Sequence, residues 1–493
     1  MAVRRSLAKA RSTRARSTQV LVGVVLSSIL GSFVGIGASR ASLPTTLTVK
    51  VIVQQWDNSD TTVRALVTQV GGLVTQDLPV VDGFAATLPS AALATVAASP
   101  AVRVISPDSM VLPQDLPSTL GPPSPDLAVI DDAPAQRAGA DGHGVTVALV
   151  DTGVANVADF ARRIVPVTGL NGQASTCVNF SSDPDCSDNY GHGTFVAGLI
   201  AGSGASSNGK FTGVAPAANL LSVKLAGRDG GSTVSKVLAA IGWVLVNKDA
   251  YNIRVLNLSL RVDSTLSYRL DPVNLAVERA WAAGLVVIVS AGNQGSSAAT
   301  IAKPADDPWV ISVGSVDDQG TANLKDDTPS SFSSRGPTVA DGLAKPDLAV
   351  SGRHLVSLRS PGSAADLSYP YFYDANYRYG SGTSFSAGIV SGAAAALLSS
   401  QPSASNDRVK YQLVGAGRPI SGAGPMDVGS GVPDMVAALN AGAGVANADN
   451  FHPVFWPTNP GVPADFVGPI VWVGSNWQGS NWQGSNWQSA YWQ

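Results

Sequence analysis

Hydrophobic residues follow two alternating patterns over the larger part of the chain, from about residue 137 to 440. Continuous apolar runs at 145–150 (VTVALV) and 285–290 (LVVIVS) are typical of parallel strands that are covered on both faces. Between them, apolar residues recur at helical spacing: Val234, Val237, Leu238, Ile241 and Leu245. This order predicts an α/β domain with a mostly parallel sheet and helices on both of its faces.

One helix of this domain carries start and stop signals. Asp271 and Pro272 are suited to the N-cap and the first helical position, and Gly284 is suited to the C-terminal end. In such domains ligands bind beyond the carboxyl ends of the strands, so residues at those ends are the candidates for chemistry.

The segment before residue 137 has a different pattern. Residues 45–108 predict a small α+β unit, with strands at 47–53, 81–88 and 102–105 and helices at 62–70 and 91–98. A proline-rich stretch follows over residues 113–136 and predicts a linker. Its prolines are Pro113, Pro117, Pro122, Pro123, Pro125 and Pro134.

The first 41 residues have the composition of an export signal. Six basic residues precede an apolar stretch from Val20 to Ala38, and Ser39-Arg40-Ala41 offers a cleavage site between small residues. The pair Arg4-Arg5 leaves open whether export follows the general or the twin-arginine route. An uncleaved membrane anchor is the alternative, because the apolar stretch is nearly long enough to span a bilayer.

Composition narrows the function classes. The chain has 493 residues, enough for two or three domains, a net charge of −3 and only 14% charged residues. Its basic cluster lies at the extreme N-terminus, so nothing in the charge pattern indicates a nucleic-acid partner.

Two cysteines fit an oxidising compartment. Cys177 and Cys186 lie nine positions apart in a polar loop and are expected to form one short disulfide, with two unpaired thiols as the alternative. Between and beside them, Asp183, Asp185 and Asp188 offer oxygen ligands for calcium or form a solvated acidic loop.

The C-terminal tail, residues 446–493, ends in a repeat. Trp477, Trp482, Trp487 and Trp492 recur every five residues, a spacing that places them on one face of neither a helix nor a strand. The exposed rings suit stacking, either on a wall polysaccharide or on the body of the same protein.

Three positions in the α/β domain have the side chains of nucleophilic catalysis. Asp151 follows a predicted strand, His192 lies in Gly-His-Gly-Thr before an apolar helix, and Ser384 lies where a small-residue loop enters an Ala-rich helix. A serine hydroxyl needs a base such as imidazole, and a carboxylate fixes the tautomer of that imidazole. The tetrahedral intermediate also needs hydrogen-bond donors. Asn293, after the strand at 285–290, and the backbone N–H of Ser384 are the candidates.

These motifs resemble the subtilisin-like serine proteases, or subtilases. The order Asp, His, Ser matches, as do Asp151-Thr152-Gly153, Gly191-His192-Gly193-Thr194 and Gly382-Thr383-Ser384. The resemblance covers residues 137–445 as a peptidase domain. It implies a triad of Asp151, His192 and Ser384, with Asn293 in the oxyanion hole and no cofactor required for the chemistry. It further implies that residues 42–112 are a ferredoxin-like inhibitory propeptide, cut away within 113–136.

The resemblance also implies where substrate binds. The segment 228–232 is similar to the edge that pairs with an extended substrate, and 257–260 to the opposite wall of the cleft. The implied substrate-binding residues are Gly230, Gly231, Ser259, Leu260, Ala291 and Gly292. Two positions depart from the family pattern: Gly388 replaces a usual proline after the nucleophile, and Arg261 replaces a usual glycine at the cleft wall.

The sequence therefore predicts a secreted serine endopeptidase, made as a self-processed zymogen, that acts on polypeptides and stays extracellular or at the cell surface. An inactive surface-binding protein on a peptidase scaffold is the alternative. An esterase of the α/β-hydrolase kind is disfavoured, because no Gly-x-Ser-x-Gly elbow surrounds Ser384 and the order of its triad residues differs.

Overall fold

The fold was examined in a computed structural model that describes residues 47–113, 121–130, 132–444 and 446–447. The predicted export signal and the tryptophan repeats lie outside these residues. Within them, eight strands form a central sheet in the order β16-β15-β14-β12-β6-β10-β9, with β17 also paired to β15. All pairings in this sheet are parallel except that of β15 with β16. The predicted mostly parallel sheet is confirmed.

The strands of this sheet have the following bounds: β6 Thr146–Asp151, β9 Cys177–Asn179, β10 Asn219–Lys224, β12 Ile253–Leu258, β14 Val286–Ser290, β15 Ile311–Asp317, β16 Thr328–Pro329 and β17 Leu348–Ser351. β6 and β14, the two runs read from the sequence, are buried at every position. Such complete burial follows from helices on both faces of the sheet.

Two helix pairs flank the sheet. Helices α5 (His192–Ala201) and α9 (Thr383–Ser400) pack together, and α9 also packs on β12, β14 and β15. Helices α6 (Val234–Asn247) and α7 (Pro272–Ala282) form the second pair. The side chain of Asp271 caps α7 by accepting from the backbone N–H groups of residues 273 and 274, as the sequence predicts. Helix α9 is apolar and long enough to cross a membrane, but 89% of it is buried, so it is a core helix.

Several shorter elements complete this body: β7 Val167–Thr168, β8 Ala174–Ser175, β11 Ser232–Thr233, β13 Leu260–Val262, β18 Leu355–Leu358, α8 Ala364–Ser368, β19 Tyr377–Gly380, α10 Asn406–Gly415, β20 Gly417–Arg418, α11 Pro425–Val428, β21 Val432–Pro433 and α12 Met435–Leu439. Helices α3 (Asp126–Val129) and α4 (Asp132–Arg137) lie inside the proline-rich stretch, where the sequence predicted only a linker. They pack on β17 and α12, so this part of the stretch belongs to the body.

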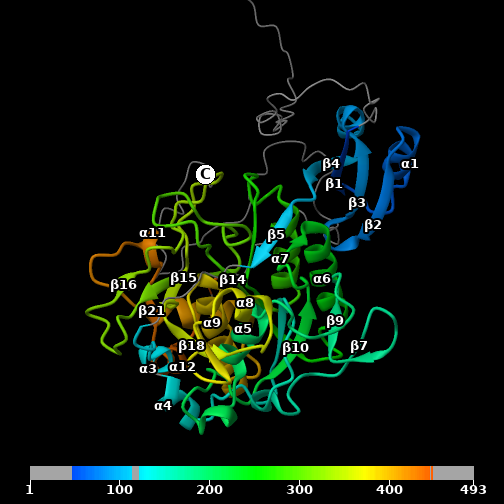
Figure 1. Ribbon diagram of the computed structural model, residues 1–493. Coiled ribbons are helices and arrows are strands. Elements are labelled where there is room, and N and C mark those ends of the chain that lie inside the picture. The colour runs from blue at the N-terminus through cyan, green and yellow to red at the C-terminus, as the bar shows by residue number, and fades with distance from the viewer. Residues whose placement is uncertain (1–46, 114–120, 131, 445, 448–493) are drawn as a thin grey trace, which may run out of the picture. The chain divides into compact units, whose positions relative to one another are not determined.

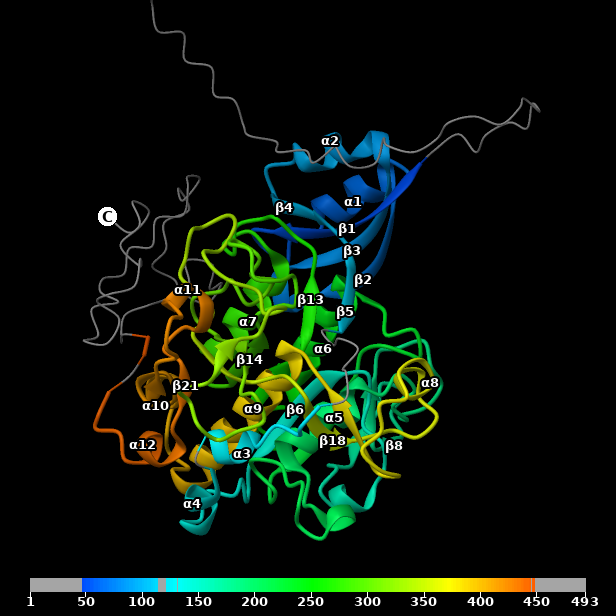
Figure 2. The same ribbon diagram turned by 60° about the vertical axis from the view of Figure 1, so that its left-hand side comes forward.

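The N-terminal unit is a separate sheet with two helices, visible in blue in Figures 1 and 2. Its elements are β1 Thr48–Gln55, α1 Thr62–Gln69, β2 Leu73–Leu78, β3 Gly83–Pro89, α2 Leu93–Ala97 and β4 Val102–Pro107. The sheet is antiparallel in the order β2-β3-β1-β4. This is the βαββαβ arrangement of ferredoxin-like units. β2 is not evident from the sequence. Its residues, LVTQDL, show no regular alternation of apolar and polar side chains, and only the last of them is buried.

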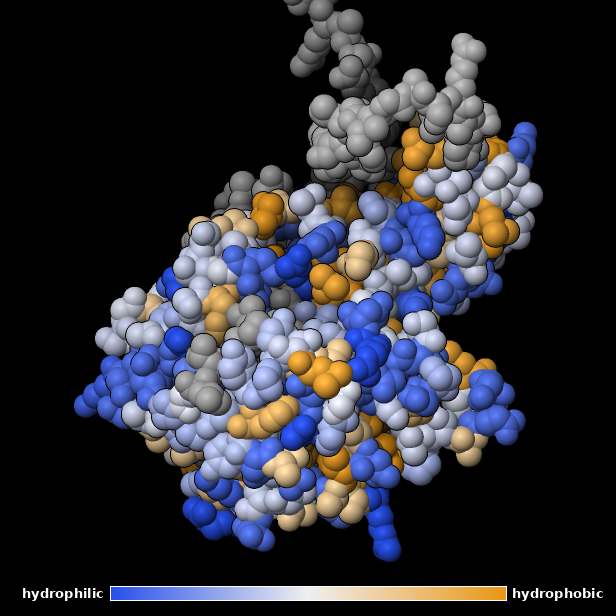
Figure 3. Space-filling view, in the orientation of Figure 1, coloured by the Kyte–Doolittle hydropathy of each residue, from blue (hydrophilic) through white to orange (hydrophobic). Residues whose placement is uncertain are grey.

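The alternation of side chains along β1 gives this unit two apolar faces. Val51 and Val53 join a small core under α1 and α2, whereas Ile52 joins the large core of the body. On the face of the molecule shown in Figure 3, hydrophobic residues are otherwise scattered among hydrophilic ones, as on ordinary water-exposed surfaces.

Candidate active site

The predicted catalytic acid and base meet at the carboxyl edge of the central sheet. Asp151 is the last residue of β6, and His192 is the first residue of α5. Asp151 Oδ1 lies 2.7 Å from His192 Nδ1, and both side chains are buried. The backbone N–H of Thr152 donates to the same carboxylate oxygen at 2.7 Å. A carboxylate at Nδ1 leaves Nε2 as the imidazole nitrogen that can exchange a proton with a nucleophile.

Two glycines allow this close approach. A Cβ on Gly193 would lie 2.2 Å from the carbonyl oxygen of Gly153 and 3.1 Å from Asp151 Oδ1. Gly153 has φ +116°, and a Cβ there would press on the backbone of residues 186–188 at 3.2–3.3 Å. Any larger residue would therefore separate the strand end from the helix start.

Ser384 lies in the first turn of α9 and faces the wall formed by Ser259. Its Oγ donates to the carbonyl oxygen of Ser259 at 3.4 Å, and Ser259 Oγ donates to the carbonyl oxygen of Ser384 at 3.0 Å. The His192 ring lies 5.4 Å, centroid to centroid, from the ring of Phe385, which is the next residue along α9. The end of β6, the start of α5 and the start of α9 thus lie close together.

Asn293 is oriented by Thr383, the residue before Ser384. Asn293 Oδ1 accepts from the Thr383 backbone N–H at 3.0 Å and from Thr383 Oγ1 at 2.9 Å. Because both bonds engage Oδ1, the amide is fixed with its Nδ2 donor on the opposite side. An oxyanion donor has to be held in place before the charge develops, and these two bonds hold this amide.

A strand from the N-terminal unit lies in the adjacent cleft. β5 (Met110–Pro113) pairs in antiparallel fashion with β11 on one side and β13 on the other, forming a three-stranded sheet. Pro113 is opposite Leu260, and Val111 is opposite both Ser232 and Val262. A small pocket beside Asp151 is lined by β5 together with Gly230, Ser232, Ser259 and Leu260, among other residues.

The expected substrate-binding residues fall into two groups. Gly230, Ser259 and Leu260 line this pocket, and Gly231 directly precedes β11. Ala291 and Gly292 do not line this pocket. They lie between the end of β14 and Asn293, and the Gly292 N–H donates to Thr383 Oγ1 at 3.2 Å. The residues of β11 and β13 that pair with β5 were only partly evident from the sequence, because short edge strands have little signal of their own.

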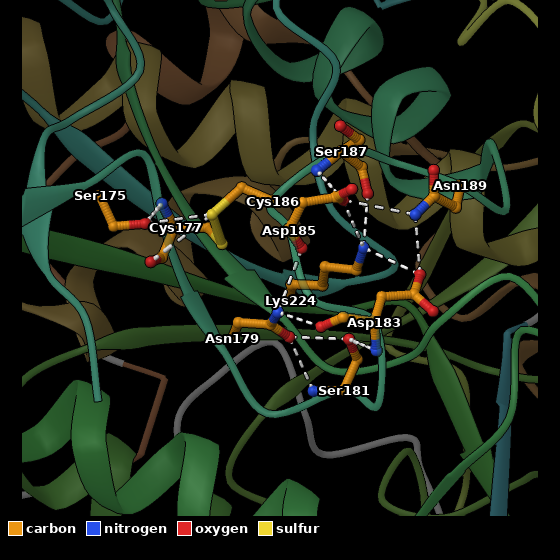
Figure 4. The surroundings of a disulfide bond; sticks show 10 residues. All are labelled: Ser175, Cys177, Asn179, Ser181, Asp183, Asp185, Cys186, Ser187, Asn189 and Lys224. Atoms are coloured by element: carbon orange, nitrogen blue, oxygen red, sulfur yellow. Dashed lines mark hydrogen bonds and ion pairs between the residues drawn. A yellow bond between two sulfur atoms is a disulfide. The ribbon is translucent and has the colours of Figure 1, made fainter. Parts of the chain in front are cut away.

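The disulfide and its acidic loop form a second cluster near the site (Figure 4). Cys177 and Cys186 are bonded, as their spacing predicts. Lys224, the buried last residue of β10, forms ion pairs with Asp183 at 3.1 Å and Asp185 at 3.7 Å. Within the described residues no group of three or more His, Cys, Asp or Glu side chains is arranged to hold a metal ion. Because two of its carboxylates pair with a buried lysine, the acidic loop is not simply solvated; a calcium site in it stays a prediction.

Asp188 is the residue of this loop whose place was not predicted. It is 1% exposed, and burial raises its pKa, against the effect of hydrogen bonds from Thr194, Gly191 and Thr152 that lower it. The sequence alone does not distinguish this buried aspartate from Asp183 and Asp185, which are more exposed and lie in the same loop.

Comparison with known proteins identifies relatives of the larger domain. Residues 142–426 match the sequence profile of the subtilase family. The chain is 42% identical over 279 residues to serine protease AprX of Bacillus subtilis, which covers 55% of this chain and 61% of AprX. It is 28% identical over 403 residues to subtilisin-like protease 1 of Arthroderma gypseum, which covers 79% of this chain and 72% of that protein. The match to AprX thus spans less than two thirds of that relative.

A solved structure shares the fold over most of the chain. Fervidolysin from Fervidobacterium pennivorans, described as a keratinolytic enzyme related to subtilisin, superposes with a TM-score of 0.63 at 24% identity. The superposition covers 80% of this chain and 61% of fervidolysin. At this level of identity the likeness concerns the fold alone.

Proposed function

This chain belongs to the subtilase family of serine proteases, and on that premise we propose that it is a secreted endopeptidase that cleaves peptide bonds through an acyl-enzyme on Ser384. The proposal is supported by the buried Asp151–His192 pair, whose imidazole lies 5.4 Å from the ring of Phe385, the residue after Ser384. It is also supported by Asn293, which is bound to Thr383, the residue before Ser384. Each group has the chemistry that its assigned role requires.

In the proposed reaction, His192 Nε2 takes the proton of Ser384 Oγ as that oxygen attacks the carbonyl carbon of the substrate. Asp151 stabilises the imidazolium that forms, and Asn293 Nδ2 and the Ser384 N–H donate to the oxyanion. His192 then gives its proton to the leaving amine as the C–N bond breaks. Water, deprotonated by the same imidazole, releases the acyl group from Ser384 and restores the enzyme.

We further propose that the N-terminal unit is an inhibitory propeptide. The support is β5, which occupies the cleft in the manner of an extended substrate and pairs with both walls. Ser384, His192 and Asp151 are all nearly inaccessible in this arrangement. Removal of the unit would open the cleft to other polypeptides. The basic and apolar N-terminus and the disulfide support export before or during this maturation.

The test compares the purified full-length chain with its Ser384→Ala variant. The unsubstituted chain is expected to cut itself between its N-terminal unit and its body and then to hydrolyse a peptide substrate. The Ser384→Ala variant is expected to remain one chain and to be inactive while keeping the same thermal unfolding behaviour. Cleavage of the purified variant at an unchanged rate would contradict self-processing, and an inert unsubstituted chain would favour the alternative of a binding protein.

A further inference from the structure

Asp188 connects the two elements that carry the catalytic acid and base. Its Oδ1 accepts from Thr152 Oγ1 and from the Gly191 N–H, both at 2.7 Å. Its Oδ2 accepts from the Thr194 N–H at 2.7 Å and from Thr194 Oγ1 at 2.6 Å. Thr152 directly follows Asp151, whereas Gly191 and Thr194 flank His192. One carboxylate therefore bonds to the end of β6 and to the start of α5.

The two threonines cross-brace the same elements. Thr152 Oγ1, while donating to Asp188, accepts from the backbone N–H of Gly193 in α5 at 2.9 Å. Thr194 Oγ1, while donating to Asp188, accepts from the backbone N–H of Ala155 beyond β6 at 3.0 Å. Each hydroxyl has one hydrogen and uses it on Asp188, so the carboxylate sets the direction of both hydroxyls.

Four donors to two oxygens favour the ionised carboxylate and oppose the burial that raises the pKa of Asp188, because each oxygen already accepts from a backbone N–H, which cannot accept a proton in return. The negative charge lies at the N-terminus of α5, where the helix dipole favours it. It also lies in the buried surroundings of the His192 imidazole, where water does not screen it. Asp188 is thus a second fixed negative charge at this site, besides Asp151.

The loop that carries Asp188 is itself fixed on both sides. Lys224 Nζ donates to the carbonyl oxygen of Ser187 at 2.6 Å, and Ser360 Oγ donates to that of Asp188 at 2.8 Å. The Cys177–Cys186 disulfide closes the loop just before Asp188 (Figure 4). This loop therefore acts as a support for the carboxylate.

We propose that Asp188 is a positioning residue of the reaction, which holds Asp151 and His192 in register and stabilises the imidazolium through its charge. The proposal rests on the proposed function, since it assigns a role in a reaction that Ser384 and His192 must carry out. Asp188 touches neither the substrate nor the reacting atoms, and its effect passes through Thr152 and the first turn of α5.

The experiment measures kcat and KM on a short peptide amide, per active site titrated with a fluorophosphonate, for the enzyme purified after maturation of the full chain. Asp188→Asn removes the negative charge. It also replaces one carboxylate oxygen with an NH2 group, which cannot accept from the two donors that this oxygen serves. We expect kcat to fall about tenfold or more, since a small misplacement of catalytic groups is costly, while KM stays within about twofold. The acid limb of the kcat/KM profile should move down by about half to one pH unit, because the imidazolium loses a neighbouring negative charge.

The matched control is Asp185→Asn, which makes the same charge change in the same loop at an exposed residue. Its carboxylate contacts Lys224, the Ser187 N–H and Asn189, but neither Thr152 nor the first turn of α5. Its kcat and acid limb are expected to stay as in the unsubstituted enzyme. A second pair of variants tests the brace if Asp188→Asn does not fold. Thr152→Val, which removes the hydroxyl, should lower kcat, and Thr152→Ser, which keeps it, should restore most of the rate.

The outcomes separate the two proposals. An unsubstituted enzyme without activity refutes the proposed function and leaves the bonding of Asp188 as a structural feature. An active enzyme whose Asp188→Asn form keeps both kcat and the acid limb refutes the positioning role. A lowered melting temperature with unchanged kcat per titrated site also refutes it, because that result describes a merely structural residue. Equal rates for Thr152→Val and Thr152→Ser would count against the brace.

Discussion

At the residue scale, Asn293 is the side chain whose orientation is most directly linked to chemistry. Asn293→Ala is predicted to lower kcat by about 10²–10³-fold with little change in KM, because the amide donates to charge that exists only in the transition state; that magnitude was established on subtilisin itself. The measurement is steady-state kinetics on a peptide substrate. Asn376→Ala, at an exposed loop asparagine, serves as the control. A loss confined to KM would assign Asn293 to substrate binding.

A second residue, Asp327, shows how burial and charge affect stability away from the site. Its side chain is 2% exposed, and neither carboxylate oxygen has a hydrogen-bond partner among the described residues. Burial, followed by the nearby Asp318, Asp326 and Asp317, raises the pKa of Asp327 to about 7. A folded-state pKa above the unfolded one means that the folded state binds the proton more tightly. Its contribution to stability is therefore present at low pH and is lost between about pH 4 and 7.

Asp327→Asn is consequently predicted to stabilise the protein above pH 7, on the order of 2 kcal/mol, because the amide removes the cost of burying a charge. At pH 5 the gain should be smaller, since the carboxyl is then protonated in the fold. Thermal unfolding at pH 5 and pH 8, in a Ser384→Ala background that prevents self-digestion, checks this. An equal shift at both values would show that ionisation of Asp327 is not involved.

At the element scale, β5 is the part of the N-terminal unit that enters the cleft, and Val111 is its buried side chain. Val111→Asp is predicted to weaken inhibition of the mature enzyme by the added 46–113 segment at least tenfold. The reason is that a buried valine contributes about 1.5–3 kcal/mol and that each 1.4 kcal/mol changes an equilibrium constant about tenfold. Met110→Asp, at the exposed neighbour, is the matched control. Equal inhibition by all three segments would contradict the role of β5.

The elements that can be predicted from this sequence are those with their own local signal. β6 and β14 are continuous apolar runs, and α7 has a capping aspartate, a proline at its first position and a glycine after its end. β5 has only four residues beside a proline-rich stretch, and its partners are far away in the sequence. Its pairing is decided by tertiary structure, which no local pattern reports.

The same distinction holds within the site. Asp151, His192, Asn293 and Ser384 each follow a strand or begin a helix, so sequence alone indicates them. Asp188 has no such mark, because its partners are threonine hydroxyls and backbone N–H groups from the end of β6 and the start of α5. Its role depends on which donors surround it, and that information exists only in three dimensions.

At the scale of the whole molecule, the N-terminal unit is attached to the body by charged contacts as well as by β5. Arg279 of α7 pairs with Asp82 and donates to the carbonyl oxygen of Pro79 at 3.1 Å. Arg103 donates to the carbonyl oxygen of Arg269 at 2.8 Å. Together with the burial of Ile52 in the core of the body, these contacts explain how a unit with its own small core can remain on the enzyme until it is cut.

The register of β5 predicts where that cut falls. Pro113 lies opposite Leu260, and the adjacent Ser259 contacts Ser384, so the scissile bond should lie within a few residues after Pro113. N-terminal sequencing of the processed enzyme checks this position. A first cut before β4 or beyond α4 would mean that β5 does not deliver the bond to Ser384.

The most direct test of the account is to treat the mature enzyme with a fluorophosphonate and to map the modified peptide by mass spectrometry. Because such probes react with a serine only where a base activates it, the predicted result is one adduct per molecule on Ser384. The adduct should be lost in a folded His192→Ala chain that unsubstituted enzyme has cut to the mature form. A folded, matured protein that carries no adduct on Ser384, or one that carries the adduct on another serine, would contradict the assignment of the nucleophile.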